Sequence, residues 1–333
     1  MQVRLRPYTC PVCGYCNLYQ ARVREPAEKA CSVRALRPAP ASRPSAVVFD
    51  RLAPMKTTCS TFLCALLALL PAAGLRALEL QGPLVQGGVL LGRVAPGTPI
   101  TLDGRRVRVS GEGVFVIGFD RDAPPSHTLV AGSERRELEI KTRDYDVQKV
   151  TGIAQRIMEP SKADLERIGR EQALVDRARA TDDAREDFAA GFSWPILGRI
   201  SGVYGSQRYY NGVSSRPHYG VDVAAPVGAL VRAPAPGLVT LAEPDLFYSG
   251  GTVIIDHGHR LSSSFLHLSK VLVKVGQRLE AGDVIALVGA TGRATGPHLD
   301  WRMSWKDARV DPQLLAGAMP DLPPPMSAPG GTR

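Results

Sequence analysis

The chain has 333 residues, of which 44% are hydrophobic, 6% aromatic and 22% charged, and its formal net charge is +9. The length suits two packed domains, and the composition excludes a disordered chain and a membrane protein with several spans. Residues 1–54 carry nine Lys or Arg against three Asp or Glu, and the chain from residue 78 is nearly neutral, so the charge does not favour nucleic-acid binding.

All six cysteines lie before residue 65, which excludes a disulfide scaffold for the rest of the chain. Cys10, Cys13 and Cys16 have the spacing of half a zinc knuckle, and Cys31 is the nearest fourth ligand. The repeat lacks a matching second half, which argues against zinc binding there.

Residues 55–77 have the pattern of a secretory signal peptide. Lys56 follows Met55, residues 61–74 form an apolar run, and the segment ends at the small residue Ala77. The run is shorter than the ~20 residues of a spanning helix, although an uncleaved anchor is the alternative reading. We therefore expect export to the periplasm or cell envelope, no membrane span after cleavage, and a non-native or disordered extension over residues 1–54.

The segments that follow predict two β-rich regions joined by a helical linker. Residues 78–150 contain short strands punctuated by Gly and Pro, with a hairpin turn at Asp103-Gly104, and predict a small β domain. Residues 151–195 predict a helical linker, because Ser161 and Asp164 form a capping-box pattern before apolar residues at helical spacing. The Pro- and Gly-rich tail, residues 317–333, is expected to be disordered.

Residues 196–316 predict a mostly β domain, an antiparallel sandwich or barrel-like sheet. The expected strands are 200–204, 220–224, 230–233, 238–242, 252–256, 261–268, 284–288 and 298–305.

Five of the six histidines fall between residues 218 and 298. His218 and Asp222 are four residues apart, and His298 and Asp300 are two apart, so each pair shares one face of an extended strand. Simple alternation also places Phe265, His267 and Ser269 on one face and Leu266 and Leu268 on the other. His257 and His259 lie at a Gly-containing turn and are interpreted as structural.

This set of side chains fits zinc-dependent hydrolysis. Three nitrogen and oxygen ligands hold the metal and leave a position for water, and neighbouring imidazoles move protons and stabilise the oxyanion. A single histidine would more often be a satisfied polar residue, but five polar residues in phase on three strands favour a functional cleft.

The motifs SRPHYGVD, GGTVIIDHG, SSSFLHLS and GATGRATGPHL resemble those of the lysostaphin/LytM-type zinc endopeptidases, over residues 198–312. This resemblance implies the duplicated-hybrid-motif β fold, a bound zinc ion, and hydrolysis of peptide cross-links in peptidoglycan stems. It implies zinc binding by His218 and Asp222, and catalytic roles for His267 and His298 as general base and transition-state stabiliser.

The chain departs from the family at the third zinc ligand, where Asp300 replaces the second His of the H-x-H motif. An Asp oxygen binds zinc at nearly the same distance, so Asp300 is expected to be the third ligand. The alternative is a degenerate domain that binds peptidoglycan or activates another hydrolase. Tyr204, Arg208 and Asn211 precede the first ligand and are predicted to bind substrate at the cleft rim.

The sequence does not indicate whether the protein has protein regulators, or what residues 78–150 do.

Overall fold

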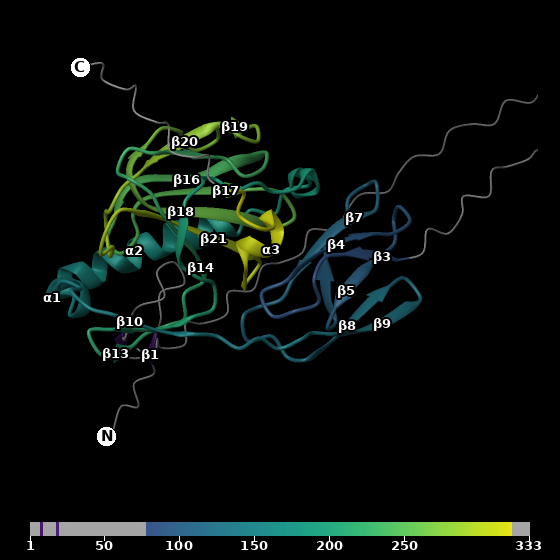
Figure 1. Cartoon of the computed structure of the whole chain (residues 1–333). Helices are drawn as coiled ribbons and strands as arrows, with labels where there is room; N and C mark the ends of the chain where they lie inside the picture. The colour runs from purple at the N-terminus through teal and green to yellow at the C-terminus, as the bar shows by residue number, and fades with distance from the viewer. Residues whose placement is uncertain (1–6, 9–17, 20–77, 322–333) are drawn as a thin grey trace, which may run out of the picture. The chain divides into compact units, whose positions relative to one another are not determined.

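The structure, a computed structural model, describes residues 7–8, 18–19 and 78–321 (Figure 1). The predicted signal peptide and most of the predicted extension and tail lie outside the described residues, as do all six cysteines. Strands β1 (Pro7–Tyr8) and β2 (Leu18–Tyr19) pair in antiparallel fashion. Among the helices of the described part, none is both long and apolar enough to span a bilayer.

Residues 78–140 form two small antiparallel sheets, with strand orders β3-β4-β7 and β6-β5-β8-β9. The strands are β3 (Glu79–Gln81), β4 (Val89–Arg93), β5 (Ile100–Leu102), β6 (Arg105–Val107), β7 (Val114–Gly118), β8 (Ser126–Ala131) and β9 (Glu134–Glu139). The predicted hairpin is present, because Asp103 and Gly104 join β5 to β6 with φ angles of 50° and 75°. Phe115, Ile117 and Leu129 are buried in the core.

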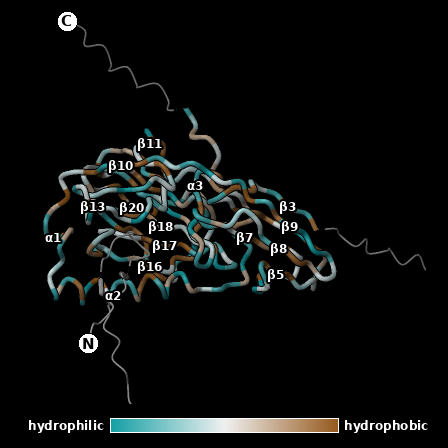
Figure 2. Tube along the Cα trace, turned by 90° about the horizontal axis from the view of Figure 1, so that it is seen from below, coloured by the Kyte–Doolittle hydropathy of each residue, from teal (hydrophilic) through white to brown (hydrophobic). Residues whose placement is uncertain are grey.

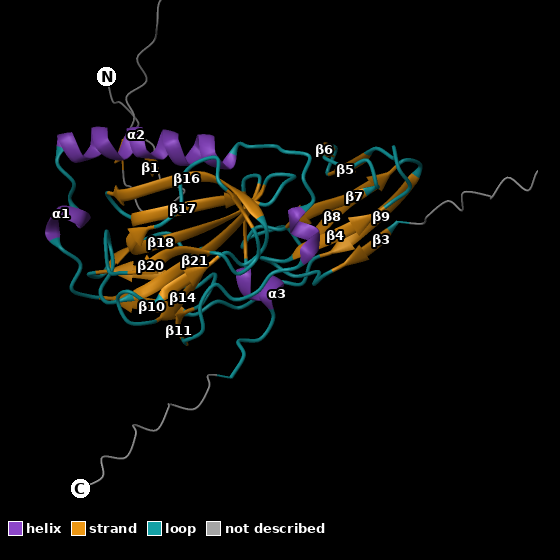
Figure 3. Ribbon diagram, turned by 90° about the horizontal axis from the view of Figure 1, so that it is seen from above, coloured by secondary structure: helices purple, strands orange, loops and turns teal. Residues whose placement is uncertain are grey.

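The linking region contains α1 (Gln155–Met158), α2 (Lys162–Arg179) and the 3-10 helix η1 (Asp187–Ala190). The Ser161–Asp164 capping box begins α2 as predicted. Apolar and polar residues alternate along the helix (Figure 2), and its buried Ile168, Val175 and Ala178 belong to one core cluster with residues of the large sheet. The helix therefore lies along β16 and β17 (Figure 3).

The large sheet has ten strands, with the main order β11-β14-β21-β18-β17-β16-β19. Its strands are β11 (Arg199–Gly202), β14 (Gly220–Ala224), β15 (Leu230–Arg232), β16 (Gly237–Leu246), β17 (Gly250–Asp256), β18 (Leu261–Val271), β19 (Arg278–Leu279), β20 (Val284–Val288), β21 (His298–Trp305) and β22 (Ala308–Val310). The mostly β prediction is confirmed, and this order is an open path, so these strands form no closed barrel. The short helix α3 (Pro312–Ala316) follows β22.

A fifth sheet combines the end of residues 78–150 with the start of the second β region. Strand β10 (Val147–Val150) pairs in parallel with β12 (Gln207–Tyr210), which pairs with β13 (Val213–Ser214). The two-residue alternation did not predict β12, because the segment VYGSQRYYNG is polar and glycine-rich, or β13, because that strand has only two residues. This pairing brings the residues before α1 beside those that precede the first predicted ligand.

Candidate metal centre and cleft

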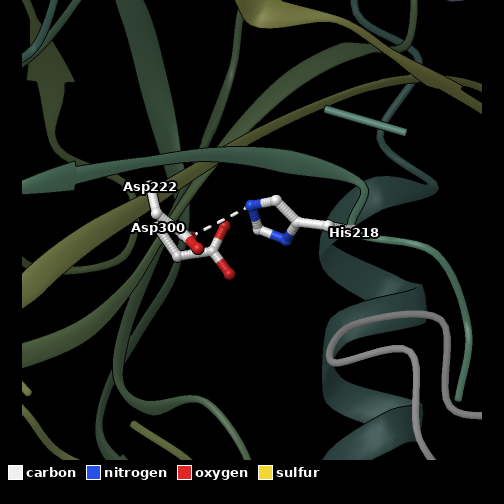
Figure 4. A group of neighbouring side chains, drawn as sticks. All are labelled: His218, Asp222 and Asp300. Carbon is white, nitrogen blue, oxygen red and sulfur yellow. Dashed lines mark ion pairs between the residues drawn. The ribbon is translucent and has the colours of Figure 1, made fainter. Parts of the chain in front are cut away.

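The three predicted metal ligands converge in the structure (Figure 4). Strands β14 and β21 are antiparallel neighbours in which Asp222 lies directly opposite Asp300, so their side chains leave the same face. His218 lies two residues before β14 and is fixed by backbone hydrogen bonds to Ser206 and Gly205, of 2.8 and 2.7 Å. One ligand atom from each of His218, Asp222 and Asp300 lies within 4.8 Å of the others.

The donor set fits a divalent cation. Within the described residues, both ring nitrogens of His218 and Oδ1 of Asp222 are buried without a hydrogen-bond partner. His218 Nε2 lies 3.0 Å from Asp222 Oδ1, but not in hydrogen-bonding geometry. Such orphaned polar atoms are costly unless something else satisfies them, and imidazole nitrogen with carboxylate oxygen is a zinc-type ligand set.

The ligands also have protonation states that suit metal binding. Burial, and next the charge of Arg208, lower the pKa of His218, which keeps the imidazole neutral. Burial alone would raise the pKa of both aspartates. The neighbouring His218 imidazole and the positive charge of Arg208 instead hold the pKa of Asp222 well below its usual value, and Arg302 lowers that of Asp300 to about 2. Both carboxylates are therefore ionised.

Each ligand carboxylate is paired with an arginine. Arg208 Nη2 donates to Asp222 Oδ2, and the two side chains are only 13% and 10% exposed. Arg302 donates from Nε to both oxygens of Asp300, at 3.0 Å each, and from Nη2 to Oδ2 at 2.6 Å. The predicted substrate-binding residue Arg208 thus holds a ligand in place.

The two predicted catalytic histidines adjoin this group. Their ring centroids are 4.8 Å apart. The Nδ1 atoms of His267 and His298 each lie 2.8 Å from a backbone carbonyl, of Thr291 and Gly296 respectively. Because a carbonyl only accepts, Nδ1 carries the proton in each ring and Nε2 is an acceptor. These Nε2 atoms point to the ligands, at 3.9 Å from Asp300 Oδ2 and 3.8 Å from Asp222 Oδ1.

A local irregularity orients His267. Between β17 and β18, Gly251 pairs with Leu268 but Val253 pairs with Phe265, so β18 has one extra residue, a β-bulge. His267 has a φ of 65°, which is uncommon for a residue other than glycine. The predicted simple alternation is therefore wrong: Phe265 and Leu268 belong to one core cluster and Leu266 to the other. Burial, and next the charge of His298, lower the pKa of His267 to about 4.

A cavity of about 510 Å³ opens beside these groups. It is lined by Gln148, Lys149, Val150, Ile153, Arg199, Ser201, Arg208, Tyr210, Asp222, His267, Arg293, Ala294, Thr295, Gly296, Pro297 and His298. Part of its wall is thus β10, a segment to which the sequence assigned no role. Gln148 Oε1 also accepts a 3.1 Å hydrogen bond from Arg208 Nε, so β10 supports the arginine that holds Asp222.

The other two predicted substrate-binding residues make internal contacts. Tyr204 is 2% exposed and donates its hydroxyl to the Arg309 carbonyl at 2.6 Å. The side-chain amide of Asn211 bonds both backbone groups of Ile153, at 2.8 and 3.3 Å. Neither lines the cavity.

His257 bonds the Pro236 carbonyl and Ser263 Oγ, at 2.6 and 2.8 Å, and lies outside the metal-ligand group.

Comparison with known proteins identifies the family of the chain. The description "Peptidase family M23" matches residues 216–312, which include all five site residues. A crystal structure from Pseudomonas aeruginosa assigned to peptidase M23 is 33% identical, with a TM-score of 0.55, and the match covers 70% of this chain and 95% of that one. The chain belongs to peptidase family M23.

Two curated relatives are similar over part of the chain. The peptidoglycan DD-endopeptidase ShyB of Vibrio cholerae is 42% identical over 134 residues, which are 39% of this chain and 28% of ShyB. The DD-carboxypeptidase/endopeptidase Mpg of Neisseria meningitidis is 36% identical over 127 residues, which are 38% of this chain and 29% of Mpg. The chain thus matches less than a third of the length of these relatives.

Proposed function

We propose that the protein is an exported zinc-dependent metallo-endopeptidase that hydrolyses peptide cross-links of peptidoglycan. The observation that carries the proposal is the cluster of His218, Asp222 and Asp300 with two imidazoles whose Nε2 atoms face it. The names of the curated relatives support peptidoglycan as the substrate. Export rests on the signal-like pattern of residues 55–77, with the periplasm or cell envelope as the destination.

In this proposal His218, Asp222 and Asp300 hold the zinc ion. When bound there, zinc polarises the scissile carbonyl and acidifies a water molecule. The remaining steps belong to the protein. His267, kept neutral by burial, accepts the proton of the attacking water at Nε2 and returns it to the leaving amine. His298 faces the same space; with a proton on Nε2 as well as on Nδ1, it would donate a hydrogen bond to the carbonyl oxygen and stabilise the charge that develops there.

The cavity wall favours an extended peptide with acidic groups as the substrate. Lys149, Arg199 and Arg293 line it, and Asp222 is the one acidic residue among the described residues that line it. Since Arg208 already compensates the charge of Asp222, the side chains that line the cavity have a net positive charge. This charge can attract carboxylates of a stem peptide. We assign no substrate contact to Tyr204 or Asn211, because both are engaged internally.

The test uses the purified chain from residue 78 on purified sacculi. We expect about one zinc per protein by elemental analysis, and release of shortened cross-linked fragments by chromatography that a chelator abolishes and added zinc restores. His267→Ala should retain zinc and lose cleavage, and His127→Ala, outside the cluster, should cleave normally. Metal-free protein that binds sacculi but never cuts them would instead support the degenerate binding domain.

A further inference from the structure

The replacement of the expected third His ligand by Asp300 is accompanied by a specific neighbour. Arg302 lies two residues further along β21, so both side chains leave the same face of the strand. Asp300 is 1% exposed and Arg302 5%, and three hydrogen bonds of 2.6–3.0 Å join them. A pair buried in this way has excluded nearly all the water that would otherwise screen its charges.

A glycine on the next strand provides the space for this pair. Gly220 lies opposite Arg302 in the β14–β21 register. A Cβ atom there would be 2.6 Å from Arg302 Cγ, 2.6 Å from the Trp301 carbonyl oxygen and 2.7 Å from Asp300 Oδ1. Any larger residue would displace either the ion pair or the strand backbone.

The same arrangement occurs at the second ligand carboxylate. Gly202 on β11 lies opposite Asp222. A Cβ atom at this glycine would be 2.2 Å from Asp222 Oδ2 and 2.9 Å from Arg208 Nη2. Each carboxylate ligand therefore has its own arginine, and each ion pair fills a space left by a glycine on the neighbouring strand.

We propose that Asp300 and Arg302 act as one neutral ligand unit that replaces the imidazole of the usual ligand set. Asp300 adds one negative charge relative to His, and Arg302 cancels it, so the net charge around the ion is the same as with a neutral imidazole. Without this compensation, a second carboxylate would reduce the positive charge with which a bound divalent ion attracts a carbonyl oxygen. Arg302 is thus a positioning residue, and the proposal rests on the metal site of the proposed function.

The consequence is that the effect of losing Arg302 depends on the residue at position 300. With Asp300 in place, Arg302→Gln removes the hydrogen bonds that orient the carboxylate. We expect this loss of positioning to outweigh the gain from removing a positive charge near the ion, so zinc affinity should fall about 10- to 100-fold. With Asp300→His, the arginine is a buried cation beside the metal and lacks its carboxylate. There, adding Arg302→Gln should increase zinc affinity about tenfold, which is about 1.4 kcal/mol.

The experiment measures the wild type, both single variants and the double variant by zinc competition with a chromogenic chelator. The melting temperature is measured in chelator, without metal. The melting temperature of Asp300→His should lie below that of the double variant, because a buried unpaired charge is costly. Arg302→Lys should retain more zinc affinity than Arg302→Gln, and Arg232→Gln, on the exposed side of β15, should have the same small effect in both backgrounds.

Opposite signs of the Arg302→Gln effect in the two backgrounds support the neutral unit. Loss of affinity in both backgrounds, or in neither, overturns it and makes Arg302 an ordinary structural residue. If the wild type binds no zinc at all, the proposed function fails. The claim that the pair is a metal ligand then fails with it, and the metal-free melting temperatures decide only the charge compensation, because they report whether Arg302 is stabilising beside Asp300 and destabilising beside His.

Discussion

The pair formed by Arg208 and Asp222 gives a prediction that links stability to metal binding. Both side chains are nearly buried, at 13% and 10% exposure, so Arg208→Gln leaves a buried carboxylate without its cation. Breaking a buried ion pair in this way costs ~3–5 kcal/mol. We use the lower end, because the His218 imidazole stays 3.0 Å from Asp222 Oδ1 and, without Arg208 beside it, can take up a proton and compensate the carboxylate.

The expected change can be read as a melting temperature. For a folded region of this size, 1 kcal/mol corresponds to roughly 2–4 °C, so the metal-free variant should melt about 6–12 °C below the metal-free wild type. A zinc ion at the site would itself compensate Asp222. At saturating zinc, the difference between variant and wild type should therefore fall to less than half.

The assay is differential scanning calorimetry of both proteins, in chelator and in excess zinc. Arg167→Gln is the matched control, because Arg167 pairs with Glu171 and with the exposed Asp245 on the surface. A surface pair is worth about 0–1 kcal/mol, so this variant should lose only a few degrees, equally in both conditions. An equal loss for Arg208→Gln with and without zinc would refute the idea that the metal and Arg208 compensate the same carboxylate.

Three further predictions concern catalysis and pH. His267→Gln should lower the rate of sacculus cleavage by about 10²–10⁴-fold with zinc content unchanged, since it removes the proton acceptor but no ligand; loss of zinc would contradict that role. Gln148→Ala removes the hydrogen bond that supports Arg208 and should lower the cleavage rate. The control is Lys141→Ala, at an exposed position outside the cavity, which should lower the rate less. Equal cleavage rates for the two variants would count against a role for β10. Burial lowers the pKa of His257 to about 4, below its value of about 6.5 in the unfolded chain. The folded protein therefore binds fewer protons at this ring than the unfolded chain does. As a result, His257 makes the metal-free protein less stable as pH falls from 6.5 to 4. Asp256 has the opposite effect, because burial raises its pKa to about 6. The test therefore compares the free energy of unfolding in denaturant of wild type and His257→Gln across this pH range. If this free energy changed with pH identically in the two proteins, the prediction would be contradicted.

The sequence predicted those parts of the molecule that depend on local pattern. The capping box of α2, the Asp103-Gly104 hairpin and strands such as β14 and β20 follow from residue type and spacing alone. Arg302 could also have been found, because it continues the two-residue spacing of His298 and Asp300 on β21. A charged residue in phase with two candidate site residues indicates that it lies at the same site. Arginine is not a metal-binding residue type, so a search for metal ligands alone does not select it.

The role of β10 could not be read from the sequence. Residues 147–150 were predicted to belong to the small β domain, and nothing in their pattern indicates pairing with β12, which lies about sixty residues away in the chain. Their parallel pairing depends on tertiary packing, including the hydrogen bonds between Asn211 and Ile153. The contact between Gln148 and Arg208 is a consequence of that pairing, so no local signal could reveal it.

The position of His267 shows why strand alternation alone cannot build this site. Strand β18 lies between β17 and β21 and is buried on both faces, so a regular strand would direct every side chain near its end into one core cluster or the other. The extra residue at the bulge lets Phe265 and Leu268 share one cluster, although they are three residues apart, and turns His267 out of both. Its left-handed backbone is held by the hydrogen bonds from its N–H to the Ser249 carbonyl and from Nδ1 to the Thr291 carbonyl, each 2.8 Å. A strained conformation persists only where its surroundings determine it, and here the same contacts that hold it also fix the tautomer that leaves Nε2 free to accept a proton.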